Sequence, residues 1–224
     1  MKKLLLITLG AAVFAALETE AKVVSATPFA DNMVLQRERD VPVWGTADAG
    51  ERVTVSFAGQ TKKATADASG KWSVSLDPMP PSKENRVLQI AGKDNAEEIK
   101  NVLVGEVWFA SGQSNMNFPI WGGSPRGRDK DGAYLTSVTR RPFIRFVKTP
   151  RNASPDAPHL NWKAVWRDFS PESFKASGYN LGAVAFHYAL ELHGALDIPI
   201  GIVDSSWGGT YLSPWTPPSG FKGR

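Results

Sequence analysis

The chain contains no cysteine and only three histidines among its 224 residues. The absence of cysteine excludes disulfides, thiolate metal sites and a cysteine nucleophile. With so few histidines, a histidine-rich metal site is not expected. The net charge is small, +4, and no block of like charge interrupts the sequence. We therefore expect no nucleic-acid partner.

Long apolar runs are also scarce, and the one that stands out lies near the N-terminus. Lys2 and Lys3 precede the segment LLLITLGAAVFAAL, which is short for a membrane span, and small residues follow up to Ala21. This order is typical of a secretory signal peptide. We expect cleavage of 1–21, a secreted or periplasmic protein, and no stable membrane insertion afterwards. A retained N-terminal anchor is the alternative, and nothing in the sequence indicates the oligomeric state.

Residues 22–104 have the pattern of an all-β domain. The segments RVTVSFAG and KWSVSLDP alternate apolar and polar residues with the period of two of a half-buried strand. Turn sequences separate such runs: ADAG at 47–50, DASG at 67–70 and DPMPP at 77–81. Short strands at this spacing predict a small β-sandwich.

The pattern changes from Gly105 onward. FIRFVKT at 143–149 and IPIGIVDSS at 198–206 are compact apolar strands, and 180–196 between them has helical spacing, with Asn180 as N-cap. The expected buried face of the helix is Leu181, Val184, Ala185, Tyr188 and Leu192. A strand, a helix and a strand imply a parallel crossover.

The predicted fold class is therefore mixed. An all-β, sandwich-like domain over 22–104 is followed by an α/β parallel-sheet domain over 105–224. An open α/β sheet normally has more strands than the few that this sequence predicts, so we expect the second domain to be incomplete.

Small polar residues follow two of the predicted strands, as SGQSN at 111–115 and DSSWGGT at 204–210. Ligands of open α/β sheets bind beyond the carboxyl ends of the strands. An acyl-transfer enzyme needs a nucleophilic hydroxyl there, together with backbone N–H donors for the developing oxyanion. Ser114 is the hydroxyl that we select. By spacing alone, however, a serine after a strand is more often a turn or N-cap residue, and Met116 replaces the glycine of the lipase elbow.

These segments resemble a known family. GEVWFASGQSNMNFP at 105–119 resembles the nucleophile block of the sialate O-acetylesterases, a carbohydrate-esterase branch of the SGNH hydrolases. IPIGIVDSSWGGTYLSPWT at 198–216 resembles their second block, and 31–59 resembles the β-domain that precedes both. In order, the resemblance covers nearly all of 27–216. It implies an SGNH-hydrolase-like fold after the β-domain, and hydrolysis of O-acetyl esters on carbohydrates without a metal or other cofactor.

The resemblance also implies roles for individual residues. Ser114 matches the nucleophile. The oxyanion donors would be the backbone N–H groups of Ser114 and of Gly208 or Gly209, while Gln113 and Asn115 match the residues that support the nucleophile. Possible substrate contacts are Trp207, Thr210 and Trp215, for which packing in the protein is the alternative.

Two departures from the family lie beside this site and leave the substrate open. Asn117 replaces a residue that is often acidic, and no acidic residue stands between Thr210 and Trp215. Acetylated xylan or another acetylated glycan is therefore an alternative substrate to acetylated sialate.

The catalytic base is not found in the sequence. The family's later QGE-type loop and its C-terminal D-x-x-H block are not found up to Arg224. We therefore expect the chain to be incomplete, either as a fragment or as a truncated gene, and to be weakly active or inactive alone. DAPH, Asp156 to His159, has the D-x-x-H spacing but lies between strands, and we interpret it as coincidence. A non-catalytic, secreted carbohydrate-binding protein is the second alternative.

Overall fold

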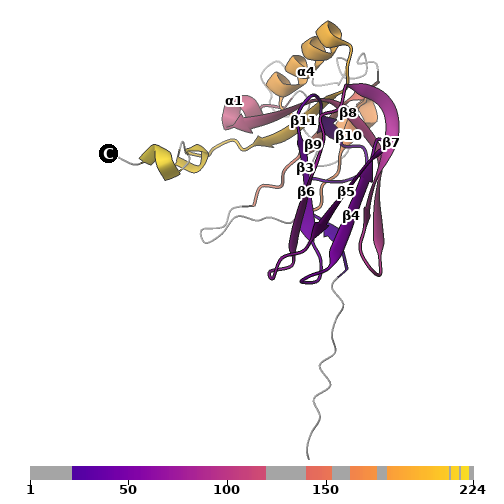
Figure 1. The fold of residues 1–224 in the computed structure, drawn as a ribbon. Helices are drawn as coiled ribbons and strands as arrows, with labels where there is room; N and C mark the ends of the chain where they lie inside the picture. The colour runs from indigo at the N-terminus through magenta and orange to yellow at the C-terminus, as the bar shows by residue number, and fades with distance from the viewer. Residues whose placement is uncertain are drawn as a thin grey trace, which may run out of the picture.

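The computed structural model describes residues 22–119, 140–152, 162–175, 181–211, 213–216 and 218–221. These residues form two β-sheets with a few short helices (Figure 1). The strands are β1 (Val24–Ser25), β2 (Val34–Gln36), β3 (Val41–Thr46), β4 (Arg52–Phe57), β5 (Gln60–Thr65), β6 (Lys71–Leu76), β7 (Ser82–Ala91), β8 (Ala96–Gly112), β9 (Arg141–Lys148), β10 (Arg167–Phe169) and β11 (Ile200–Ser206). The helical elements are α1 (Ser114–Asn117), α3 (Pro171–Lys175), α4 (Ala183–Leu196), η1 (Ser213–Trp215) and η2 (Pro218–Phe221).

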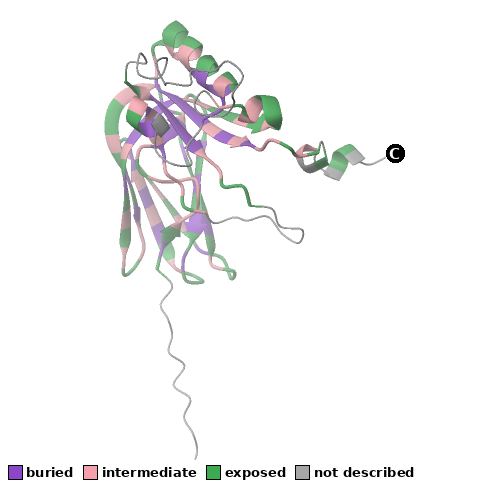
Figure 2. Ribbon diagram, turned by 180° about the vertical axis from the view of Figure 1, so that it is seen from behind, coloured by how far each residue is buried: buried purple, intermediate pink, exposed green. Residues whose placement is uncertain are grey.

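The N-terminal strands face one another across an apolar core. The small sheet has the order β1-β3-β6, and the large sheet has the order β10-β9-β11-β8-β7-β4-β5, with β2 beside β8. The predicted alternation in β4 and β6 is confirmed, because their apolar residues are buried and alternate with more exposed positions (Figure 2). The buried residues are Val53, Val55, Phe57, Trp72, Val74 and Leu76.

The predicted parallel crossover is confirmed as well. β11 pairs in parallel with β9 on one side and with β8 on the other, and α4 connects to β11. β10 adds an antiparallel strand beyond β9 and was not predicted. The last strand, β11, therefore has two neighbours in the sheet.

The predicted buried face of α4 is wrong in part. Leu181 and Ala185 are buried, but Val184 and Tyr188 are 51% and 40% exposed, and Phe186 packs instead against the sheet, with its ring stacked on Phe169 at 5.1 Å. The sheet-facing stripe thus lies about one residue further along the helix. Gly182 is the N-cap; Asn180, the expected cap, lies outside the described residues.

β8 belongs to both halves of the molecule. It runs for 17 residues, pairing with β7 and β2 up to Val104 and Gly105 and with β11 from Glu106 to Gly112. The boundary proposed between 104 and 105 therefore falls inside a continuous strand, and the division into two domains stays a prediction.

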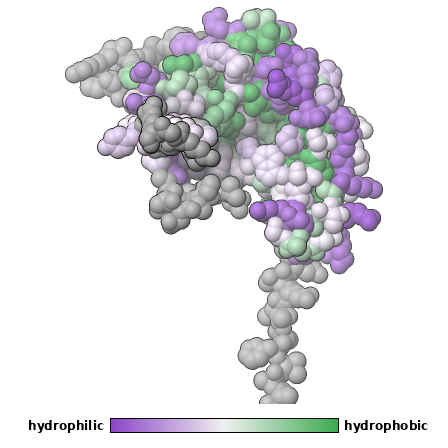
Figure 3. Space-filling view, turned by 60° about the vertical axis from the view of Figure 1, so that its left-hand side comes forward, coloured by the Kyte–Doolittle hydropathy of each residue, from purple (hydrophilic) through white to green (hydrophobic). Residues whose placement is uncertain are grey.

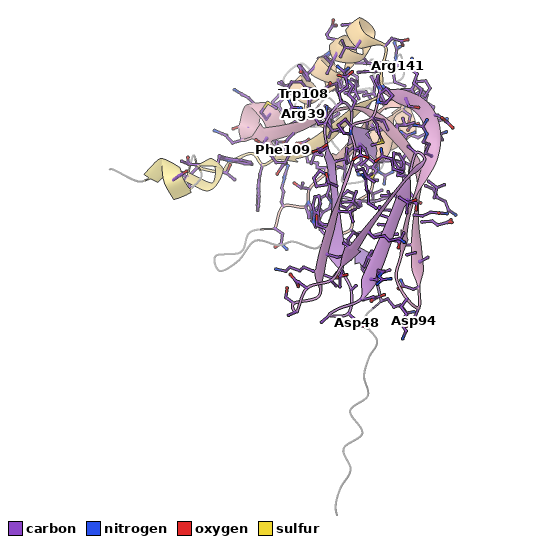
Figure 4. The ribbon with its side chains drawn as sticks, in the orientation of Figure 1. Arg39, Asp48, Asp94, Trp108, Phe109 and Arg141 are labelled. Carbon is purple, nitrogen blue, oxygen red and sulfur yellow. The ribbon has the colours of Figure 1, made fainter. Side chains whose placement is uncertain are left out.

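One side of β8 is open beyond Gly105. Over Glu106–Gly112, β11 pairs with one side, and within the described ranges no strand pairs with the other. The side chains of Trp108 and Phe109 are 44% and 66% exposed on this strand (Figure 4). Hydrophobic surface also gathers over the α/β half in the face shown in Figure 3. The open strand is thus β8.

Arg145 on β9 links the α/β half to the N-terminal β half. Its side chain is buried and donates hydrogen bonds to the backbone and side-chain oxygens of Asn101 on β8. Burial lowers the pKa of the Arg145 guanidinium to about 10.

None of the described helices is long and apolar enough to cross a membrane. The expected signal peptide, 1–21, lies outside the described residues.

Candidate active site

Ser114 stands at the first position of α1, directly after β8 ends. Gly112 turns the chain with φ +132, a conformation that residues with a Cβ rarely adopt. On its other side α1 rests on Gly182, where an ideal Cβ would lie 1.9 Å from the backbone oxygen of Met116. Glycines at both contacts allow the helix to sit this close to the sheet and to the start of α4.

The loop after β11 lies against the same helix. The Trp207 N–H donates to the Gly112 carbonyl at 2.9 Å. An ideal Cβ on Gly208 would be 3.6 Å from the Ser114 Cα and 3.3 Å from Nδ2 of Asn117. The structure thus brings together the two strand-end segments that the sequence singled out. They meet because β8 and β11 are parallel neighbours that end in register, Ser206 beside Gly112.

The side chain of Gln113 accepts hydrogen bonds from Ser114. Both the hydroxyl and the backbone N–H of Ser114 donate to Oε1 of Gln113, the N–H at 2.6 Å. The Ser114 N–H, an expected oxyanion donor, is therefore occupied in this conformation. No hydrogen bond engages the N–H groups of Gly208 and Gly209 within the described part of the chain. Asn115 is exposed.

A charged network that the sequence reading missed lies beneath α1. Asp204 is 1% exposed and accepts hydrogen bonds from the Ser206 N–H at 2.9 Å, the Gly182 N–H at 3.2 Å and Nζ of Lys148 at 3.1 Å. It therefore joins the end of β11, the start of α4 and the end of β9. A hint was present in the sequence, because Asp204 and Lys148 are charged residues in otherwise apolar strands.

Asn117 connects this network to the surface. Its Oδ1 accepts from Nζ of Lys148 at 3.4 Å and from Nη2 of Arg151 at 2.6 Å. A residue that sequence comparison marked only as a departure from the family thus occupies a central place in the site.

The three predicted substrate contacts form a short hydrogen-bonded chain. The Thr210 hydroxyl donates to the Trp207 carbonyl at 2.9 Å, and Nε1 of Trp215 donates to the Thr210 hydroxyl at 2.8 Å. All three side chains are partly buried. The chain of bonds fixes the orientation of the Trp215 ring next to the Gly208 loop.

Among the described residues, no base lies next to the serine. His187 is exposed on α4, and Nδ1 of His193 lies 2.7 Å from the carbonyl of Ile198. Asp156 and His159 lie outside the described residues. Among the residues that the structure describes, no Asp, Glu or His bonds to the Ser114 hydroxyl, and no three such side chains gather as a metal site requires.

Comparison with known proteins finds similar esterases. No family model matches the chain. The sialate O-acetylesterases of Mus musculus and Homo sapiens are each 31% identical to it, over 84% and 83% of this chain. The chain spans 36% and 37% of the lengths of these relatives.

A solved structure agrees with these relatives. A carbohydrate acetylesterase from Xanthomonas citri superposes with a TM-score of 0.75 at 30% identity, over 88% of this chain and 43% of that protein. The agreement extends along most of this chain in both sequence and fold. Over the third of these relatives' length that it spans, the chain is therefore similar to the sialate O-acetylesterase family.

Proposed function

We propose that the chain carries the nucleophile of a carbohydrate O-acetylesterase, and that acetylated sialate is its substrate. One observation carries the proposal: Ser114 is exposed at a strand end, and Gly208 lies against the same one-turn helix. The names of its relatives support the substrate class, because they are esterases of sialate or of carbohydrates.

The proposed reaction is acyl transfer in two steps. Oγ of Ser114 attacks the acetyl carbonyl and its proton passes to a base; the ester C–O bond then breaks, and the base returns the proton to the sugar oxygen, which leaves as a hydroxyl. Negative charge on the former carbonyl oxygen is stabilised by the N–H groups of Gly208 and Gly209. Water then hydrolyses the acetyl-serine and releases acetate. The Ser114 N–H joins these donors only if the Gln113 side chain turns away from it.

The aromatic residues beside the loop suit a sugar. Trp207 and Trp215 flank the Gly208 turn, and an apolar ring face is a common platform for a carbohydrate ring. Acetylated xylan, the alternative substrate, has the same kind of ring face. Comparing acetate release from the two substrates would decide between them.

A non-catalytic carbohydrate-binding role is the second candidate. It is favoured by the observation that the Ser114 hydroxyl donates to Gln113, and no acid or histidine among the described residues contacts it. Serine at its ordinary pKa is a weak nucleophile without a base. We therefore expect 22–224 alone to release acetate slowly.

The test is acetate release from 4-nitrophenyl acetate and from acetylated sialic acid by the full chain and by Ser114→Ala. We expect a slow, Ser114-dependent rate that this substitution abolishes without changing the thermal midpoint, because an exposed serine contributes little to stability. Equal rates in the two proteins would refute the nucleophile. Rapid turnover that His159→Ala removes would instead identify DAPH as the base-bearing segment.

A further inference from the structure

We propose that the side-chain amide of Asn117 is a third donor to the oxyanion formed at Ser114. The inference rests on the proposed acyl transfer and deepens it. It starts from a shortage of donors, because the Ser114 N–H is held by Gln113. Two backbone donors, on Gly208 and Gly209, then remain for a charge that forms next to α1.

The orientation of the Asn117 amide is fixed by its cationic neighbours. Lys148 and Arg151 carry only hydrogen-bond donors, so the atom that they share must be the amide oxygen. The NH₂ group consequently points the other way. There it lies beside Gly208, with Nδ2 3.3 Å from the position of an ideal Cβ.

This position is also close to Ser114. The same ideal Cβ of Gly208 lies 3.6 Å from the Ser114 Cα, so Gly208 fits between Ser114 and Asn117 on α1. No hydrogen bond engages the Asn117 NH₂ group within the described residues, and Asn117 therefore retains a free donor. An amide whose oxygen binds two cations is polarised and is a stronger donor than a free amide.

The network also restrains this donor. Asp204 holds Lys148 from below, and Lys148 is 11% exposed at its side chain, so the cation cannot easily leave Asn117. A donor that is oriented before the reaction needs little rearrangement when charge develops. An acidic residue at 117 would bind the same two cations but would offer no N–H. Asparagine alone combines both functions here.

The step balances as follows. The Ser114 Oγ–C bond forms, the carbonyl π electrons move to oxygen, and the Asn117 N–H hydrogen-bonds to that oxygen. When the intermediate collapses, the C–O bond to the leaving group breaks. With 4-nitrophenyl acetate the leaving group departs as 4-nitrophenolate, and a buffer base takes the serine proton.

The experiment measures acetylation of Ser114 in the full chain by 4-nitrophenyl acetate at pH 8, using peptide mass spectrometry. Asn117→Ala and Asn117→Asp are compared with Asn152→Asp, which adds the same negative charge at an exposed position near Arg151. In both Asn117 variants we expect the ester to acetylate Ser114 about 10²-fold more slowly, which is the loss typical of one oxyanion donor. Asn152→Asp should keep the original rate, and all variants should keep the thermal midpoint.

The Asn117→Asp variant distinguishes two roles of Asn117: donating to the oxyanion, and binding Lys148 and Arg151. If Asn117 only anchors Lys148 and Arg151, Asn117→Asp retains those contacts and also the rate, which would overturn the proposal. If Ser114 in the unmodified chain is acetylated no faster than Ser73, an exposed serine on β6, the proposed nucleophile fails and the donor assignment fails with it. If Ser114 is acetylated selectively and Asn117→Ala does not change the rate, Asn117 is not an oxyanion donor, while Ser114 remains the nucleophile.

Discussion

Replacing Gly182 by alanine should disable the site while leaving the fold in place. Gly182 lies where α1, α4 and β11 meet: it touches the Met116 carbonyl and donates its N–H to Asp204. Alanine would place a Cβ 1.9 Å from that carbonyl oxygen, whereas real contacts essentially never fall below 3.0 Å. The helix that carries Ser114 must therefore move by about 1 Å.

The magnitude follows from the size of this shift. A reacting group displaced by about 1 Å loses about 10²-fold in rate, because attack requires alignment within about 0.5 Å. The strain costs about 1–3 kcal/mol of stability, as overpacking usually does. The chain should therefore still fold, and Ser114 should be acetylated about a hundredfold more slowly.

The assay combines the rate of Ser114 acetylation with unfolding in urea. Gly194→Ala is the matched control, because Gly194 lies on α4 and an added Cβ would meet nothing within 4 Å. That control should keep the rate and gain up to about 1 kcal/mol from helix propensity. A Gly182→Ala protein that reacts within twofold of the original rate would refute the argument that this contact positions α1.

Other predictions concern stability and solubility. Arg145→Ala should lower the free energy of unfolding in urea by about 3 kcal/mol, because it leaves two partly buried oxygens of Asn101 without their donor; a loss below about 1 kcal/mol would contradict this. Residues 105–224 expressed alone should be poorly soluble, because the cut falls inside β8 and its retained part exposes Phe109 along an open side; cooperative unfolding of that piece would count against it. Burial raises the pKa of Asp168, but the hydrogen bonds from Arg140, Ser173 and Ser170 together with the charge of Arg140 outweigh this and hold the pKa below the usual value. The stability that Asp168 contributes should therefore be complete above about pH 4 and be lost as pH falls through the lower folded pKa; a thermal midpoint that falls no more steeply below pH 4 than that of Asp168→Asn would disprove it.

Much of the local structure follows from the sequence alone. β4, β6, β9 and β11 lie where alternation or short apolar runs predicted them, because a strand's side chains point to opposite faces with a period of two. The motif around Ser114 and the loop at Gly208 are likewise recognisable as strings of residues. The secondary structure that each segment prefers is encoded in its own residues.

The helix shows where local reasoning fails. Periodicity predicted a helix at 180–196 and placed Val184 and Tyr188 in its buried face, but the sheet covers Phe186 instead. Two neighbouring stripes of α4 are apolar, and the position of the sheet decides which stripe is buried. The extent of β8 has the same origin, because its pairing passes from β7 to β11 without a break in the strand.

The site depends most of all on the tertiary structure. Asp204, Lys148, Asn117 and Arg151 come from segments that are far apart in the sequence and touch only because β9, β11 and β8 are neighbours in one sheet. The occupation of the Ser114 N–H by Gln113, by contrast, is a local contact between neighbours in the chain. The sequence determined which chemical groups are present at the strand ends. The sheet order decided which of them meet, because contacts between distant segments are set by packing and not by local preference.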